Sequence, residues 1–239
     1  MNITRSSAKV HPGIALALLS SLRDKDTPDE SLEDEHYAES LPRRLGLNDV
    51  VDLQMRRYAD LRDAGRSLEL TEFLDLVRLI SRRPDATDIF RSAGAALAFE
   101  RFAESGPLSR AFRRMYPEGV RRRKLVRSMT SAGKALSPGT EIVTGRTPPG
   151  LVIDACALAP AGLHGNACEI LTSVLDVCAS EILDASLSVR HTECLGRGHE
   201  RCVWTVVSAE SGEGGGEPGE SVGPDGPVVN GNGNTRAAS

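Results

Sequence analysis

The chain has 239 residues, of which 40% are hydrophobic and 26% are charged. This apolar fraction is enough for the core of one domain with appendages, and it excludes an intrinsically disordered protein. Aromatic residues make up only 4% of the chain, which argues against a base-stacking surface for single-stranded nucleic acid. No stretch approaches the roughly 18 consecutive apolar residues of a membrane span, and the short apolar run near the N-terminus lacks a small-residue cleavage site. We therefore expect a soluble, cytoplasmic protein without a membrane span.

The net charge of −4 conceals an uneven distribution. Residues 24–39 hold eight acids and one lysine, and the tail from Ala209 holds five acids and one arginine. Removing these two segments from the 33 acids and 29 bases of the chain leaves 20 acids and 27 bases, so the body of the protein is basic. The densest positive segment lies within residues 110–127. Such a run is more often the solvated face of a helix than a nucleic-acid site, and the acidic residues 24–39 could fold back onto it.

Along the chain, the sequence first predicts a helix over about 12–23 and then an acidic linker to residue 40. From Leu41 to Leu136 apolar residues recur at three- and four-residue steps, which predicts a helical half with breaks near Gly65, Pro84 and Gly106. The segments predicted to follow are strands over 140–145 and 150–158, a helix over 167–184, and strands over 187–194 and 201–207. We expect an α+β fold: helices packed on a small antiparallel sheet, with a helical N-terminal half followed by strand-strand-helix-strand-strand.

Four regions are expected along the chain. They are an N-terminal helix with its acidic linker (1–40), a helical extension (41–84), the main domain (85–208) and a C-terminal tail (209–239). The tail is rich in Gly, Pro, Ser and Glu and has almost no apolar side chains to bury, so we expect it to be disordered.

The helix over 167–184 has a recognisable start signal. Asn166 is a favourable N-cap, and Glu169 falls at the third helical position, as in a capping box. Cys168 would then lie in the first turn, where the helix N-terminus lowers the pKa of a thiol. Cys178 falls on the apolar stripe of this helix and is expected to pack in the core. Cys156, on the expected strand over 150–158, could face a cavity.

The cysteines point to a metal site. All five lie between residues 156 and 202, and such clustering in a cytoplasmic chain favours metal binding or reactive thiols over disulfides. Cys194 and Cys202 flank a Gly-containing turn, so their sulfurs can converge across it. His191 precedes Cys194 by three residues and reaches the same point if its strand is twisted or bulged. With Cys168 these residues form a Cys₃His set, the composition of a closed tetrahedral zinc site.

Other interpretations of these residues stay open. Cys168 could be a small core residue, and the hairpin cysteines could stay reduced or form a disulfide. His191 could equally be a surface histidine, with Glu193 or water completing the metal site. His199, at the tip of the turn, is the nearest replacement ligand.

Residues 191–206 resemble the C-terminal signature of the 4-vinyl reductase domain family: Cys194 and Cys202 bracket a Gly-rich turn that is followed by Val-Trp-Thr-Val. The family includes a bacteriochlorophyll biosynthesis protein and the phenol- and toluene-type sensor domains of bacterial transcription activators. In the sensor branch a structural zinc is held by a helix Cys, a Glu and two turn Cys. That spacing matches Cys168, position 191 and the two turn cysteines here. The departure is His191 in place of Glu, which preserves a zinc ligand but changes the net charge of the site. The resemblance covers about residues 85–208.

The resemblance implies helices against an antiparallel sheet, a homodimer, and an apolar ligand cavity between the layers. We expect a binding or sensory module for a hydrophobic or aromatic small molecule, with a structural zinc. Because the ATPase and DNA-binding domains of the sensors are absent from this chain, it would report to a separate protein partner. The side chains expected to line the cavity are Ile89, Phe90, Phe102, Phe112, Met115, Tyr116, Val152 and Trp204.

The sequence leaves two other functions open. The protein could be an enzyme or accessory factor of bacteriochlorophyll or tetrapyrrole biosynthesis, by analogy with the other branch of the family. It could instead be an interaction protein whose basic segment and acidic linker dock a partner. Catalytic motifs are lacking: the sequence has no Gly-rich strand-to-helix turn, no Ser nucleophile elbow and no His-Glu-x-x-His helix. A zinc ion with four protein ligands also has no open position for a substrate, so the motifs favour binding over catalysis.

Overall fold

The computed structural model describes residues 8–26, 48–103, 116–146 and 148–208, and it confirms the expected α+β architecture. The helices are α1 (Pro12–Asp26), α3 (Asn48–Asp63), α4 (Leu70–Ile80), α5 (Ala86–Ala103), α7 (Glu118–Leu136) and α8 (Glu169–Ile182), with 3₁₀ turns η2 (Leu163–Cys168) and η3 (Leu195–Arg197). The strands are β1 (Lys9–Val10), β2 (Leu68–Glu69), β3 (Ile142–Arg146), β4 (Pro149–Ile153), β5 (Leu187–Glu193) and β6 (Cys202–Ser208). The predicted acidic linker and C-terminal tail lie mostly or wholly outside these residues.

The main sheet is antiparallel throughout and has the order β3-β4-β6-β5. Along β4 and β6, buried and partly exposed residues alternate. Leu151 and Trp204, which are paired in the register, are both fully buried. This period of two is typical of a sheet with one face covered, and here α7 and α8 cover it.

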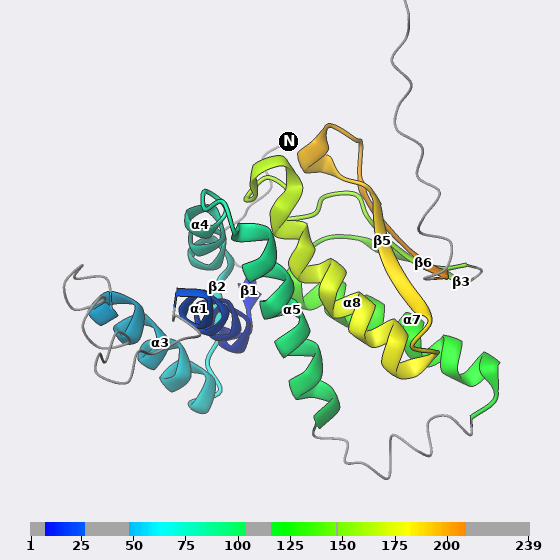
Figure 1. Ribbon diagram of the computed structural model, residues 1–239, viewed down its shortest axis with the longest axis horizontal. Coiled ribbons are helices and arrows are strands. Elements are labelled where there is room, and N and C mark those ends of the chain that lie inside the picture. Colours follow the sequence, from blue (N-terminus) through cyan, green and yellow to red (C-terminus); the bar gives the residue numbers. More distant parts are fainter. Residues whose placement is uncertain (1–7, 27–47, 104–115, 147, 209–239) are drawn as a thin grey trace, which may run out of the picture.

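The elements form successive layers (Figure 1). The sheet packs on α7 and α8, α5 lies along the other side of α8, and α1 packs on α5. One buried cluster runs through all of these layers, from Leu18 in α1 through Phe90 in α5 and Leu171 in α8 to Trp204 in β6. The N-terminal helices therefore share a hydrophobic core with the sheet half of the molecule.

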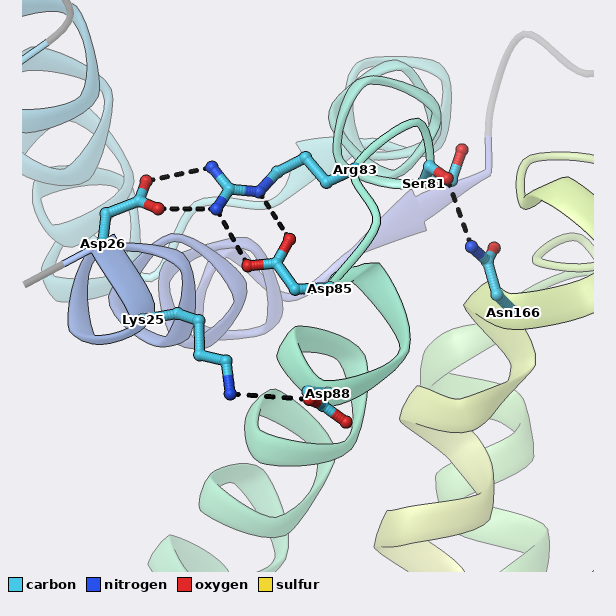
Figure 2. Close-up of polar contacts among 7 residues, drawn as sticks. All are labelled: Lys25, Asp26, Ser81, Arg83, Asp85, Asp88 and Asn166. Atoms are coloured by element: carbon cyan, nitrogen blue, oxygen red, sulfur yellow. Dashed lines mark hydrogen bonds and ion pairs between the residues drawn. The ribbon is translucent and has the colours of Figure 1, made fainter.

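Polar contacts tie the N-terminal helices to the rest, and besides an ion pair between Lys25 of α1 and Asp88 of α5, two of them involve the turn between α4 and α5 (Figure 2). Arg83, between α4 and α5, bonds to both carboxylate oxygens of Asp26 at the end of α1 and to both oxygens of Asp85. Asn166 donates from Nδ2 to the Ser81 carbonyl oxygen at 3.2 Å. Both contacts converge on the turn between α4 and α5, which thereby joins α1 to the segment before α8.

Two local predictions were wrong. Asn166 does not cap α8, because η2 precedes that helix and residue 168, its N-cap, makes no side-chain capping bond. The strand expected over 150–158 ends at Ile153 as β4, so Cys156 lies in the following turn and not on a strand.

Across the described part of the chain, no helix has both the length and the apolar character needed to cross a membrane.

Candidate metal centre

Four side chains from three segments meet at one end of the sheet. Cys168 ends η2, His191 lies on β5, Cys194 follows β5, and Cys202 begins β6. Their potential ligand atoms all lie within 4.8 Å of one another, close enough to hold a single metal ion. The three cysteines are fully buried, and His191 is partly exposed. The structure thus brings together all four residues predicted as metal ligands.

The spacing of the sulfurs fits tetrahedral coordination. The Sγ atoms of Cys168 and Cys194 are 3.9 Å apart. Two sulfurs bound to one zinc ion at about 2.3 Å in tetrahedral geometry lie roughly 3.8 Å apart. A disulfide would need a separation of about 2 Å, and none of the five cysteines is in a disulfide. The cluster therefore has the dimensions of a metal site.

His191 reaches the cluster through an irregularity in the sheet. The register between β5 and β6 shifts between His191 and Glu193, where Trp204 and Val203 are the consecutive partners. This is the bulge that the three-residue spacing before Cys194 required. The Nε2 atom of His191 is buried and has no hydrogen-bond partner among the described residues. An orphaned, buried imidazole nitrogen beside three thiols is the position that a metal ion would satisfy.

Glu193 and His199 were the alternative ligands, and both side chains have other contacts. The carboxylate of Glu193 forms an ion pair with Arg201 at 3.2 Å. The Nδ1 atom of His199 lies 3.2 Å from the carbonyl oxygen of Cys194. Neither residue belongs to the four-residue cluster.

Two glycines allow η2 and η3 to approach closely enough to form the site. Gly165 has a φ of +76°, and a Cβ at this position would overlap the sulfur of Cys194. A Cβ at Gly196 would lie 2.7 Å from the Cα of Gly165. Only residues without a side chain fit at these two points, so the glycines create the space in which the thiols converge.

The turn between β5 and β6 is held by its own hydrogen bonds. The backbone amides of Arg197 and His199 both donate to the carbonyl of Cys194, at 2.9 and 3.1 Å. The amide of Leu195 lies 3.5 Å from Sγ of Cys202 and donates to it. Backbone N–H groups aimed at sulfur stabilise its thiolate form, which is the form that binds metals.

The pKa values of two thiols in the cluster are shifted in opposite directions. The Cys168 thiol, the largest influence, lowers the pKa of Cys194 to about 6, while burial acts in the opposite direction. Contacts with Cys156, Cys194 and Cys202, together with burial, raise the pKa of Cys168, whereas its place near a helix N-terminus had predicted a lowered value. Cys194 therefore has thiolate character near neutral pH, which is the character that a metal ligand needs.

Cys156 is a fifth thiol beside the cluster. It is 2% exposed, and hydrogen bonding with Cys168 and then Cys202 holds its pKa well below the ordinary value. The sequence suggested only that it could face a cavity. Its neighbours in the fold are 12 and 46 positions away along the chain, a relationship that no local pattern reports. Cys178 is buried on α8, as predicted from its position on the apolar face of this helix.

The side chains predicted to line a ligand cavity lie in different surroundings. Ile89, Phe90 and Trp204 belong to the buried core, Val152 is half-buried on β4, and Tyr116 is 42% exposed. Phe112, Met115 and the side chain of Phe102 lie outside the described residues.

The structure has a pocket of about 300 Å³ at the other end of the sheet from the cysteines. It lies where the start of α7, the end of α8 and the strands β4, β5 and β6 meet. Its apolar wall includes Leu183, Leu187 and Val206, and its polar wall includes Arg121. None of the described residues predicted to line a cavity lies in this wall. Its volume is at the lower end of the range typical of ligand sites.

Comparison with protein-family models, with curated proteins and with solved structures gave no match to this chain.

Proposed function

We propose that the protein is a small-molecule-binding module in which a structural zinc ion fixes the C-terminal hairpin to the helical layer. The observation that carries this proposal is the convergence of Cys168, His191, Cys194 and Cys202 within 4.8 Å. Three buried thiols with one imidazole are a typical zinc ligand set.

The position of the cluster supports a structural role for the metal. Cys168 comes from the segment before α8, whereas the other three ligands belong to the β5–β6 hairpin. An ion held by all four would cross-link the helical layer to the sheet. Four protein ligands leave no coordination position for a substrate, so the proposed ion stabilises the fold and does not take part in catalysis.

The pocket supports the binding role. It is bounded by α8 and the β5–β6 hairpin, which the metal would join at the opposite end of the sheet, and by α7. At about 300 Å³ it suits a compound of one ring or a short aliphatic chain. A tetrapyrrole is several times larger than one aromatic ring, and no feature of the described residues favours that alternative. The homodimer and the protein partner stay predictions.

Elemental analysis tests the metal. The purified full-length protein is expected to contain one zinc ion per chain, and Cys202→Ser is expected to contain none. Cys178→Ser is the matched control, because Cys178 is also buried but lies on α8 away from the cluster, and this variant is expected to keep the metal. Equal metal content in the three proteins would contradict the assignment.

A variant that preserves the fold makes this test sharper. His191→Glu keeps a metal-binding side chain and is expected to retain zinc, while His191→Ala is expected to bind it at least about 100-fold more weakly, since even changes around a ligand cost 10- to 100-fold. Circular dichroism establishes that both variants are folded. Equal zinc affinity in His191→Ala and the parent protein would remove His191 from the ligand set.

A thermal-shift screen tests the binding role. The panel contains single-ring aromatic and short aliphatic compounds, each in a charged and an uncharged form. A compound that binds the folded state raises the melting temperature in a saturable way. A panel in which no compound shifts the melting temperature would contradict the proposed function while leaving the zinc site intact.

A further inference from the structure

The wall of the pocket between α7, α8 and the sheet includes Arg121, whose guanidinium forms no ion pair with a described residue. Of its charged side chains, Glu118 and Arg122 pair with each other at 2.6 Å. Asp184 accepts hydrogen bonds from the backbone amide and the hydroxyl of Ser186, at 2.9 and 2.8 Å. Arg121 has no carboxylate within ion-pair distance among the residues that the structure describes. The wall as a whole carries two acids and two bases, and Arg121 is the base in it that forms no ion pair with a described residue.

The orientation of Arg121 is fixed by α8. Its Nη1 donates to the Leu183 carbonyl oxygen at 2.6 Å. This carbonyl lies at the C-terminus of α8, where the last carbonyls lack intrahelical partners and the helix dipole attracts a cation. One edge of the guanidinium is thus held in place by the fold.

The other edge has an unused donor. The Nε atom of Arg121 is buried and has no hydrogen-bond partner in the part of the chain that the structure describes. A buried donor without an acceptor is costly, and such groups normally have a partner in protein, water or ligand. The Nε–H and the outer Nη–H of a guanidinium form a fork that matches the two oxygens of a carboxylate.

Part of the pocket wall is apolar. Leu183, Leu187 and Val206 lie on the wall together with Arg121. A ligand that satisfies both parts has a carboxylate at one end and an aromatic ring or short aliphatic chain at the other.

We propose that this pocket binds small monocarboxylic acids with an apolar body, and that Arg121 holds the carboxylate. The inference rests on the proposed binding function and names its ligand class. It also makes Arg121 the residue that discriminates the acid from an uncharged compound of the same shape.

Matched pairs of an acid and its amide test the proposal directly. The probes are benzoate and benzamide, 3-phenylpropionate and 3-phenylpropionamide, and hexanoate and hexanamide. Isothermal titration calorimetry with the purified full chain measures each dissociation constant. For at least one pair, the acid is expected to bind roughly 10- to 100-fold more tightly than the amide, the range typical of a charged hydrogen-bonded pair.

Variants on one helix connect this preference to one side chain. Arg121→Met is expected to abolish the preference for the acid. Arg123→Met removes the same charge from an exposed position on α7 outside the pocket wall and is expected to keep the preference. Arg121→Lys provides the test if the methionine variant does not fold, because lysine keeps the charge but lacks the fork and is expected to lose most of the preference.

The outcomes separate this inference from the function on which it rests. Amides that bind as tightly as their acids, or an acid preference that survives in Arg121→Met or Arg121→Lys, would overturn the carboxylate assignment while the binding function stands. A panel in which neither acids nor amides bind would overturn both.

Discussion

The imidazole ring of His191 lies flat against the indole ring of Trp204, with ring centroids 4.3 Å apart and planes within 5° of parallel. Trp204 is itself fully buried, and its Nε1 donates to the hydroxyl of Thr172 on α8 at 3.0 Å. The histidine therefore stacks on a side chain that is buried against the helical layer. Through this stack, the core of the protein directs the unpartnered Nε2 of His191 toward the thiols.

Replacing the indole should weaken the metal site without touching a ligand. Trp204→Ala is expected to lower the free energy of unfolding by about 3–5 kcal/mol and the zinc affinity by roughly 10- to 100-fold, because His191 loses the surface that orients it. Chemical denaturation measures the first quantity, and competition with a chromophoric chelator measures the second. Thr172→Val is the control, since it removes the hydrogen bond but keeps the stack and is expected to retain the zinc affinity. Unchanged affinity in Trp204→Ala would show that the stack does not position His191.

Two glycines with similar backbone conformations provide a test of steric access to the cluster. Gly165 and Gly198 have φ values of +76° and +91°, so alanine is strained at either position. A methyl group at Gly165 would also overlap the sulfur of Cys194, whereas nothing lies within 4 Å of one at Gly198. We expect Gly165→Ala to lose zinc in elemental analysis and Gly198→Ala to retain it, with a stability cost of about 1–3 kcal/mol from strain alone. Equal zinc content in the two variants would mean that the approach of η2 to η3 is not needed for binding.

The sequence was most informative where the site is local. Cys194 and Cys202 flank one turn, and a hairpin brings its two ends together whatever the rest of the fold does. His191 needed one irregularity of its strand, and the register shift at that residue provides it. The α+β order of elements also follows from periodicity, which depends only on neighbouring residues.

Features that depend on distant partners were beyond the sequence. Asn166 has the composition of a cap, but its amide bonds to Ser81, 85 positions away. Arg121 was part of a basic run, and only the fold places it against Leu183, 62 positions away. Ile89 and Phe90 were expected to line a cavity on the basis of the family resemblance, and that expectation stays a prediction. In this fold both are buried in the core.

The contact between α1 and the turn before α5 should depend on pH. Arg83 bonds to Asp26 and Asp85, and the hydrogen bond from Arg83 is the main cause that lowers the pKa of Asp85 below its ordinary 3.8. A depressed carboxylate pKa stabilises the folded state above the ordinary value, and this stabilisation is lost as the pH falls through the lower folded value. We expect Arg83→Gln to destabilise the protein by about 1 kcal/mol at pH 7, since the arginine is partly solvated. Arg82→Gln, at an exposed neighbouring position, is expected to have almost no effect.

Urea unfolding from pH 7 down to pH 3 measures this dependence. The difference between the parent protein and Arg83→Gln should be constant near neutrality and should shrink below pH 3.8. A difference that persists undiminished at pH 3 would indicate that Arg83 acts through packing of its side chain and not through the carboxylates.

At high pH, the ionisation of Tyr58 on α3 should lower the stability of the folded state. Burial, followed by the charge of Glu72 and a hydrogen bond to it, raises the pKa of Tyr58 to about 12. A raised pKa means that the neutral phenol stabilises the folded state. This contribution is complete below the ordinary value of 10.0 and is lost as the pH rises through the folded value of about 12. Spectrophotometric titration of the three tyrosines should show one late transition that is missing in Tyr58→Phe. The stability advantage of the parent protein over Tyr58→Phe, about 1 kcal/mol at pH 7, should narrow above pH 10. If every tyrosine of the folded protein ionised near pH 10, the contact between α3 and Glu72 would not hold the phenol in its neutral form.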